Sequence, residues 1–305
     1  MLILLSLFTV VSHAVSAGRP KAKRVVLIAL DGISVNGFKT ARTPCLDELL
    51  SQGALSLETR VVMPSVTLPN WTSHLTGSGP EQHGVADNDW QINKRQLPPV
   101  AVDADGSYPS VFQVLKEALP GCRTAFYYNW ANLIYPYNQK YFDEAGFLEN
   151  DGYVPNYQKA YDFIVRHQEE PVLVFLYSVH TDHAGHNHKW MSPEYIRSDW
   201  LCEWKFNEER FPDPKGFIGR LKKAGLYEDT HFLFLSDHGG IEYGHGGLSE
   251  DEMIVPWGIT GPGIKSGMKL EEPNNTVNTA ATVLYLFQVA APSSWTGEVP
   301  YSVFE

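Results

Sequence analysis

The chain has 305 residues, of which 43% are hydrophobic and 19% are charged, a composition typical of a folded globular protein and unlike that of disordered or fibrous chains. Acidic residues outnumber basic residues by 35 to 24, which gives a formal net charge of −11, and Lys and Arg are not concentrated in any stretch. This balance argues against a structural nucleic-acid partner held through its phosphates.

Residues 1–17 have the pattern of a signal peptide. An apolar stretch from Leu2 to Val11 is followed by small residues that allow cleavage after Ala14 or Ala17. The stretch is shorter than the roughly 20 apolar residues that a membrane-spanning helix needs, and no later segment qualifies. We therefore expect a secreted or periplasmic protein whose mature chain has no transmembrane anchor.

Apolar, β-branched runs alternate with amphipathic segments along the rest of the chain. The runs predict strands buried on both faces at residues 24–30, 123–128, 171–179 and 231–236. The amphipathic segments predict helices at residues 43–53, 110–121, 157–170, 215–225 and 276–290. Thr43 is a candidate cap for the first helix, Pro44 suits its first turn, and Gly53 ends it. This alternation predicts an α/β fold over residues 18–305, a single domain with a mostly parallel central sheet and helices on both faces.

The three cysteines are Cys45, Cys122 and Cys202. Their wide spacing is not that of a zinc knuckle, so we expect ordinary buried thiols, although one disulfide is compatible with export. Two Asn-X-Thr sequons begin at Asn70 and Asn274. The second lies in a polar turn and is the better candidate for glycosylation, because the first falls within the expected active site.

Ionisable residues follow three of the predicted strands, at the point where each strand ends. Working residues of parallel α/β sheets gather just beyond the carboxyl ends of the strands. The set consists of three aspartates and three histidines: Asp31, Asp182, His186, Asp237, His238 and His245.

Taken singly, these residues have ordinary structural explanations. Asp31 precedes a glycine and could turn a loop, Asp182 and His186 could form a surface pair on a helix, and His238 could be a core histidine. Together they argue for a cation, because several unpaired ionisable groups at one sheet edge would each cost several kcal/mol in desolvation. Mixed carboxylate and imidazole donors suit zinc, with manganese or iron as alternatives. The number of donors is enough for two divalent ions about 3.5–4 Å apart.

A hydroxyl that could act as the nucleophile lies in the segment 63–88. Thr67 precedes Leu-Pro-Asn, so it is expected to cap a helix that has Pro69 in its first turn, where backbone N–H groups favour phosphate oxygens. Coordination to a metal would lower the pKa of the alcohol. Ser65 is the alternative nucleophile, and a plain capping role for Thr67 is the structural alternative.

The motifs LIALDG, PSVTLPNWTSHLTGSGPEQHGVADN, TDHAGH, SDHGG and GHGG occur in this order. The chain resembles the type I phosphodiesterase/nucleotide pyrophosphatase branch of the alkaline phosphatase superfamily over roughly residues 24–295. The resemblance implies an alkaline-phosphatase-like core and an in-line attack by Thr67 on phosphorus, followed by hydrolysis of a phospho-threonine. It also implies that Asn88 holds a phosphate oxygen, whereas His183 and His188 match no role in the family. The ligands that it implies for one zinc are Asp31, Thr67, Asp237 and His238, and those for the other are Asp182, His186 and His245.

Two features depart from the family pattern. The chain has little room for the extra domains of the larger animal members, so their nucleotide pocket is not carried over. The segment 198–214 is rich in Trp and has no clear periodicity, and we interpret it as an atypical insertion at the surface.

Several other functions are alternatives to a phosphodiesterase acting on a small-molecule phosphodiester or pyrophosphate. The Cys/Ser-X-Pro-X-Arg motif of sulfatases is absent from the sequence, and the Gly-X-Ser-X-Gly motif of serine hydrolases is absent as well. A phosphate monoesterase is expected to use an arginine near the nucleophile, where this chain offers Asn88. A non-catalytic exported binding protein is disfavoured because no predicted ligand is missing. The aromatic segment 127–137 and Trp90 could stack on a base or simply pack in the core.

Overall fold

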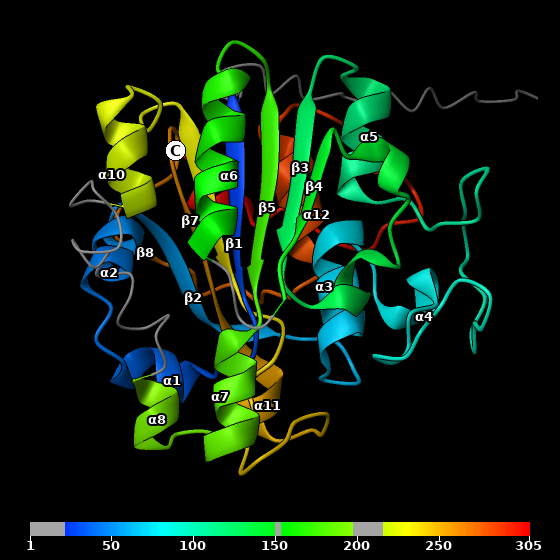
Figure 1. Cartoon of the computed structure of the whole chain (residues 1–305), viewed down its shortest axis with the longest axis vertical. Coiled ribbons are helices and arrows are strands. Elements are labelled where there is room, and N and C mark those ends of the chain that lie inside the picture. Colours follow the sequence, from blue (N-terminus) through cyan, green and yellow to red (C-terminus); the bar gives the residue numbers. More distant parts are fainter. Residues whose placement is uncertain (1–21, 150–153, 198–215) are drawn as a thin grey trace, which may run out of the picture.

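The computed structural model describes residues 22–149, 154–197 and 216–305 (Figure 1). The predicted signal peptide at 1–17 and the predicted insertion at 198–214 lie outside these ranges. The described residues form an eight-stranded sheet with the strand order β4-β3-β5-β1-β6-β7-β2-β8. Its strands are β1 Arg24–Leu30, β2 Gly53–Arg60, β3 Arg123–Tyr128, β4 Glu144–Phe147, β5 Val172–Ser178, β6 Thr230–Leu235, β7 Ile254–Thr260 and β8 Met268–Lys269. Strand β7 is antiparallel to both of its neighbours, and the other adjacent strands run parallel.

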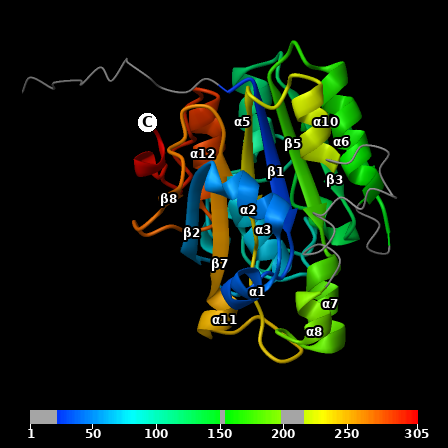
Figure 2. The ribbon, with the colours of Figure 1, turned by 90° about the vertical axis from the view of Figure 1, so that its left-hand side faces the viewer.

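Helices cover both faces of this sheet (Figures 1 and 2). The α-helices are α1 Val35–Thr40, α2 Pro44–Ser51, α3 Thr67–Thr76, α4 Pro80–His83, α5 Val111–Ala118, α6 Val154–Arg166, α7 His180–His188, α8 Pro193–Ile196, α10 Gly216–Lys223, α11 Glu250–Met253 and α12 Asn278–Leu286. Short 3-10 turns lie at Ala131–Ile134, Gln139–Tyr141 and Tyr301–Val303. In the described part of the chain, no helix combines the length and the apolarity needed to cross a bilayer.

Strand β1 shows why the sheet has a core on each face. All seven of its residues are buried. Val25 and Leu27 pack in one core with side chains of α3, α5 and α12, whereas Val26 and Ile28 pack in the other with α2, α6 and α10. Successive side chains of a strand point to opposite faces, so a continuous apolar run such as this one requires cover on both sides.

The carboxyl ends of the central parallel strands form one edge of the sheet. In Figure 1 this edge faces downward, toward α1, α7, α8 and α11. The first residue beyond β1, Asp31, donates its backbone N–H to Ser178 O at the end of β5, at 3.0 Å. The residues that follow β1, β5 and β6 therefore lie next to one another at this edge of the sheet.

The sheet confirms the predicted α/β architecture, and the four predicted strands are found within one residue of their expected ends. The predicted helices are also present, but several are shorter, and α12 ends at Leu286 rather than at residue 290. Strands β2, β4, β7 and β8 were not predicted. Gly53, expected to end a helix, is the first residue of β2, and a Cβ there would lie 2.0 Å from Ile259 O on β7.

Both sequons lie at buried asparagines. The Asn70 amide nitrogen donates to the backbone carbonyls of residues 62, 64 and 66, which leaves no room for a glycan. The preference for Asn274 was wrong for the folded chain, because this residue is 5% exposed and its amide nitrogen donates to Thr59 Oγ1 at 2.9 Å. Cys45 and Cys122 are free thiols, and Cys202 lies outside the described residues.

Candidate metal centre

The sheet edge brings together all seven side chains that were predicted as metal ligands. Five of them follow a central strand directly or stand on the helix after it: Asp31 after β1, Asp182 and His186 on α7 after β5, and Asp237 and His238 after β6. His245 comes from the loop before α11, and Thr67 from the start of α3. Segments more than 200 residues apart in sequence therefore contribute to one site.

His238 lies at the centre of the first group. Its Nε2 is 3.2 Å from Asp31 Oδ1, 3.3 Å from Asp237 Oδ2 and 3.2 Å from Thr67 Oγ1. His238, Asp31 and Asp237 are fully buried, and Thr67 is 5% exposed. Two carboxylates, an imidazole and a hydroxyl thus face one another in a dry environment.

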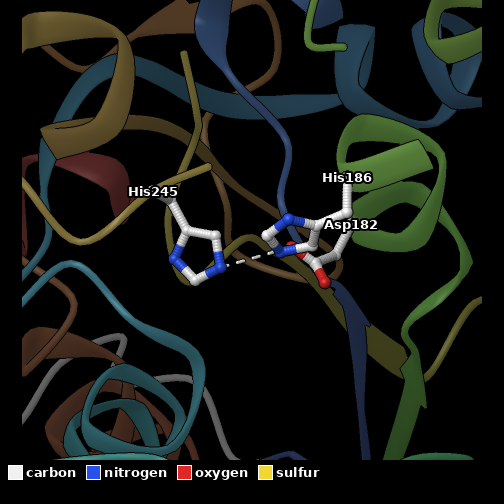
Figure 3. A group of neighbouring side chains, drawn as sticks. All are labelled: Asp182, His186 and His245. Carbon is white, nitrogen blue, oxygen red and sulfur yellow. Dashed lines mark ion pairs between the residues drawn. The ribbon is translucent and has the colours of Figure 1, made fainter. Parts of the chain in front are cut away.

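Asp182 is the centre of the second group, which is shown in Figure 3. Its Oδ1 is 3.4 Å from His186 Nε2 and 3.6 Å from His245 Nε2. A set of ligand atoms from Asp182, His186 and His245 lies within 4.8 Å, as does a set from Asp31, Asp182 and His238. Asp182 therefore stands between the two groups, a position that its assignment to a single ion did not anticipate.

The three histidines share one orientation. In each ring Nδ1 lies against a backbone carbonyl: Gly239 O for His238 at 2.8 Å, Tyr243 O for His186 at 2.8 Å and Ser65 O for His245 at 3.0 Å. A carbonyl only accepts, so Nδ1 carries the proton and Nε2 faces the carboxylates. Metal-binding histidines are commonly fixed in this way by a carbonyl at the other ring nitrogen.

Each of the three carboxylates leaves one oxygen without a hydrogen-bond donor among the residues that the structure describes. These atoms are Asp31 Oδ1, Asp182 Oδ1 and Asp237 Oδ2. The other oxygens of the two deepest carboxylates are held: Gly32 N–H donates to Asp237 Oδ1 at 3.2 Å, and Tyr177 Oη donates to Asp31 Oδ2. Unpaired buried oxygens facing imidazole nitrogens are the donor set that divalent zinc prefers, so the residues fit the predicted ions.

Burial controls how the carboxyl groups titrate. It raises the pKa of Asp237 well above its ordinary value, and the charge of Asp31 raises it further. Burial also raises the pKa of Asp31, with a further contribution from Asp182. For Asp182 burial again opposes ionisation, but the close approach of His186 Nε2 at 3.4 Å and the neighbouring histidine charges outweigh it and lower the pKa. Three carboxylates this close need positive charge among them.

The pKa values of His238 and His245 are shifted in opposite directions. Burial opposes the positive charge on His238, but the carboxylates of Asp237 and Asp31 outweigh it and raise the pKa of the ring to about 10. Burial lowers the pKa of His245 to about 3, and the charge of His238 acts in the same direction. The two rings are stacked, with centroids 3.7 Å apart. The raised pKa of His238 reflects the negative charge of the carboxylates that its Nε2 faces, and it shows that this position favours a positive charge.

Thr67 is the first residue of α3, and the prediction that it caps this helix was wrong. The cap position is Val66, and no side chain of that residue closes the turn. Instead, Asn88 reaches in from a distant loop, and its Oδ1 accepts the Leu68 N–H at 2.8 Å. Because Asn88 satisfies the helix end, the Thr67 hydroxyl is left to face His238. The same bond fixes the Asn88 amide beside Thr67.

Helix α3 is anchored to several parts of the site. Trp71, one turn after Thr67, directs its indole N–H to Asp31 Oδ2 at 3.4 Å. His74, a further turn along, binds Ser236 O through Nε2 at 3.1 Å and Thr279 Oγ1 through Nδ1 at 2.8 Å. Ser65, the alternative nucleophile, donates its hydroxyl to Gly247 O at 2.7 Å and faces that loop rather than the ligands.

The structure does not give every candidate a place in the site. His188 is exposed and His183 is half-buried, and neither belongs to a group of ligand atoms. The aromatic residues of 127–137 mostly pack in the core, as does Trp90 at 5% exposure, which favours the structural interpretation of both. The role of Tyr177 was not predicted, because a tyrosine inside an apolar strand gives no local sign that its hydroxyl reaches a carboxylate.

Glu252 on α11 was also missed. Its carboxylate accepts the Gly247 N–H at 2.8 Å and the Ser249 N–H at 3.2 Å, and its backbone carbonyl accepts the Gly239 N–H at 3.0 Å. The residue therefore joins the turn that carries His238 to the loop that carries His245. A Ser-x-x-Glu capping box at the start of α11 was a local sequence signal that could have revealed it.

The sequence matches the family model of type I phosphodiesterase / nucleotide pyrophosphatase over residues 25–249, which includes every predicted ligand. The chain belongs to this family.

The relatives are distant in sequence. The chain is 25% identical over 238 residues to ectonucleotide pyrophosphatase/phosphodiesterase family member 1 of Rattus norvegicus, covering 70% of this chain and 24% of that protein. It is 25% identical over 239 residues to an uncharacterised pyrophosphatase/phosphodiesterase of Schizosaccharomyces pombe, covering 70% of this chain and 44% of that protein. The chain thus spans less than half the length of these two relatives.

The fold is shared with a solved structure of the same family. The inactive form of murine ectonucleotide pyrophosphatase/phosphodiesterase 5, in complex with AMP, superimposes with a TM-score of 0.74 at 14% identity. The match covers 92% of this chain and 100% of that one. It confirms the alkaline-phosphatase-like α/β core that the sequence predicts.

Proposed function

We propose that this protein is a metal-dependent phosphodiesterase or nucleotide pyrophosphatase in which Thr67 is the nucleophile. The observation that carries the proposal is the meeting of Thr67 with three aspartates and three histidines at one sheet edge, where three carboxylate oxygens have no donor among the described residues. Family membership supports the same reaction class.

Two divalent ions, with zinc favoured, are the proposed cofactors. Asp31, Thr67, Asp237 and His238 would hold one, and Asp182, His186 and His245 the other; the reach of Asp182 toward both groups supports a closely spaced pair. When bound, such ions lower the pKa of an alcohol and offset the charge of a phosphoryl group.

Residues of the chain itself are proposed to supply the nucleophile, a contact to the phosphate and access for the substrate. Thr67 Oγ1 gives up its proton to solvent and forms the bond to phosphorus as the bond from phosphorus to the alcohol or phosphate on the opposite side breaks. Water then hydrolyses the phospho-threonine, which restores the Thr67 hydroxyl and releases the phosphate product. The Asn88 amide, held beside Thr67 by its bond to Leu68 N–H, donates to a non-bridging phosphate oxygen. A bound cation would keep Asp31 and Asp237 ionised behind the hydroxyl, against the burial that raises the pKa of both. The His186 side chain is 41% exposed, which gives the second group an open side for substrate and water.

The proposed substrate is a small-molecule phosphodiester or pyrophosphate, and no structural nucleic-acid partner is expected from a chain with a net charge of −11. The apolar segment within residues 1–17 supports export to a secreted or periplasmic location. The alternatives within the superfamily are a phosphate monoesterase and a sulfatase-like hydrolase, and a non-catalytic binding protein is the alternative outside it.

Turnover of model esters separates these alternatives. We expect bis-p-nitrophenyl phosphate to be hydrolysed faster than p-nitrophenyl phosphate or p-nitrophenyl sulfate, and a chelator to abolish the activity until zinc is restored. Preference for the monoester or for the sulfate would replace the proposal with the corresponding alternative. Absence of all three activities in a zinc-loaded protein would favour the binding protein.

Thr67→Ala tests the nucleophile. The variant should lose at least 10³-fold in kcat, because no other hydroxyl replaces the attacking oxygen, while retaining most of its zinc. Thr76→Ala is the matched control: Thr76 is equally buried at the far end of α3, and its hydroxyl donates only to Thr72 O. Activity of Thr67→Ala close to that of Thr76→Ala would rule out the phospho-threonine route.

A further inference from the structure

The two oxygens of Asp31 lie in different surroundings. Oδ1 faces His238 Nε2 at 3.2 Å and has no hydrogen-bond donor among the described residues. Oδ2 accepts the phenol of Tyr177 on β5 and, at the longer distance of 3.4 Å, the indole N–H of Trp71 on α3. Asp31 is completely buried and Tyr177 is 1% exposed, so water does not substitute for either donor.

We infer that Tyr177 is a positioning residue that determines which oxygen of Asp31 is offered to the metal. A carboxylate with two equivalent oxygens can rotate, and a donor that holds one oxygen fixes the other toward the ligand position. Hydrogen-bond partners behind metal ligands commonly contribute 10- to 100-fold to metal affinity. The inference rests on the proposed function, because it takes Asp31 to be a ligand.

The surrounding rings make this donor rigid. Trp71 packs edge-on against Tyr177, with ring centroids 5.6 Å apart, and both rings belong to the same core. The phenol therefore reaches Asp31 from a fixed strand and a packed ring rather than from a mobile loop. A tyrosine that served only to fill this core would be replaceable by phenylalanine without effect on the metal.

Tyr195 provides a matched control for the same substitution. It is fully buried, and its hydroxyl accepts the Ser34 N–H at 3.2 Å and donates to Gly32 O at 2.9 Å, one residue from Asp31. Tyr177→Phe and Tyr195→Phe thus each remove one buried phenol near the site. Only the first phenol binds a carboxylate oxygen of a proposed ligand.

The experiment is a calorimetric titration of zinc into chelator-stripped wild type, Tyr177→Phe and Tyr195→Phe, with near-ultraviolet circular dichroism to verify folding. We expect Tyr177→Phe to bind one of two zinc ions 10- to 100-fold more weakly and the other normally, and Tyr195→Phe to match the wild type. If Tyr177→Phe binds both ions as the wild type does, or if both variants weaken equally, the inference is wrong and the proposed function stands. If the wild type itself binds no zinc, the proposed function fails.

Trp71→Phe offers a second route if Tyr177→Phe is recovered unfolded. This change removes the longer donor to the same oxygen, so we expect a smaller loss of affinity confined to the same ion. Zinc binding identical to that of Tyr195→Phe would overturn the inference in that case as well.

Discussion

Replacement of Asp237 by asparagine should stabilise the metal-free protein and destabilise the zinc-loaded protein. In the metal-free state the Asp237 carboxylate is fully buried, and its Oδ2 makes no hydrogen bond within the described part of the chain, with His238 Nε2 at 3.3 Å as its nearest positive group. The introduced amide keeps an oxygen for Gly32 N–H, now 3.2 Å from Oδ1, and removes one of three neighbouring negative charges. The opposite signs expected in the two states distinguish a ligand from an ordinary buried residue.

The size of each effect follows from the burial. An unsatisfied buried polar group costs about 1–3 kcal/mol, so the metal-free variant should gain about that much, or roughly 2–10 °C in Tm. Zinc at 1,000 times its Kd adds about 4 kcal/mol per site, and loss of a carboxylate ligand forfeits most of this at one of them. The zinc-loaded variant should therefore unfold at a lower temperature than the zinc-loaded wild type.

The metal-free difference should also depend on pH. Burial raises the pKa of Asp237 in the folded state above its ordinary value of 3.8, so the folded wild type binds a proton more tightly than the unfolded chain does. Its stability contribution is then present at acidic pH and is lost as the pH rises through the folded pKa. The amide does not titrate, so the advantage of Asp237→Asn should grow from pH 4 upward.

Thermal unfolding with chelator and with zinc, between pH 4 and pH 8, measures all three effects. Glu271→Gln, the same chemical change at an exposed position, should alter none of them. A lower Tm for Asp237→Asn in the metal-free state at neutral pH would refute the argument, because it would mean that the attraction between Asp237 and His238 outweighs the cost of burying the carboxylate.

Two other perturbations probe the substrate side and the proton balance of the site. Asn88→Ala should lower kcat/KM by about 10²–10³-fold, because the proposed donor to the phosphate oxygen is lost. Zinc affinity should stay within a few-fold of the wild type. Steady-state kinetics and zinc titration measure the two quantities, and a loss of zinc affinity would mean that Asn88 only supports α3. Because the pKa of His238 is raised to about 10, zinc binding at pH 7–8 should displace a proton from this ring. Calorimetry in buffers of different ionisation enthalpy measures that proton, and equal heats in all buffers would contradict its presence.

The central strands were predictable because their sequences leave little choice. After Arg24, the run that became β1 is continuously apolar, and the run that became β5 is almost entirely apolar, so only a sheet covered on both faces can bury them. Strand β2, GALSLETR, alternates polar and apolar residues directly after a helix, and β7, IVPWGIT, contains a proline and a glycine. Their pairing with each other is decided by tertiary contacts, which a local pattern does not encode.

The convergence of the proposed ligands was predictable for a related reason, since most of them follow a parallel strand and parallel strands end at one edge of the sheet. What the sequence could not provide was the relation between them. The position of Asp182 between the two groups depends on the orientation of α7 relative to β5. The hydrogen bond from Leu68 N–H at the start of α3 to Asn88 joins residues 20 positions apart. The phenol of Tyr177 was hidden for the same reason, because its contact with Asp31 spans 146 residues.

Helix α3 touches the nucleophile position and the ligand-bearing strands at once. Thr67 is its first residue, Trp71 donates its indole N–H to Asp31 after β1, and His74 hydrogen-bonds the carbonyl of Ser236 just after β6. The hydroxyl of Thr67, the proposed nucleophile, therefore belongs to the same helix as two side chains that contact the segments after β1 and β6. We expect thermal motion to displace Thr67 and the side chains around it together. The distance between the Thr67 hydroxyl and the proposed ligands, on which the proposed in-line displacement depends, should then stay constant.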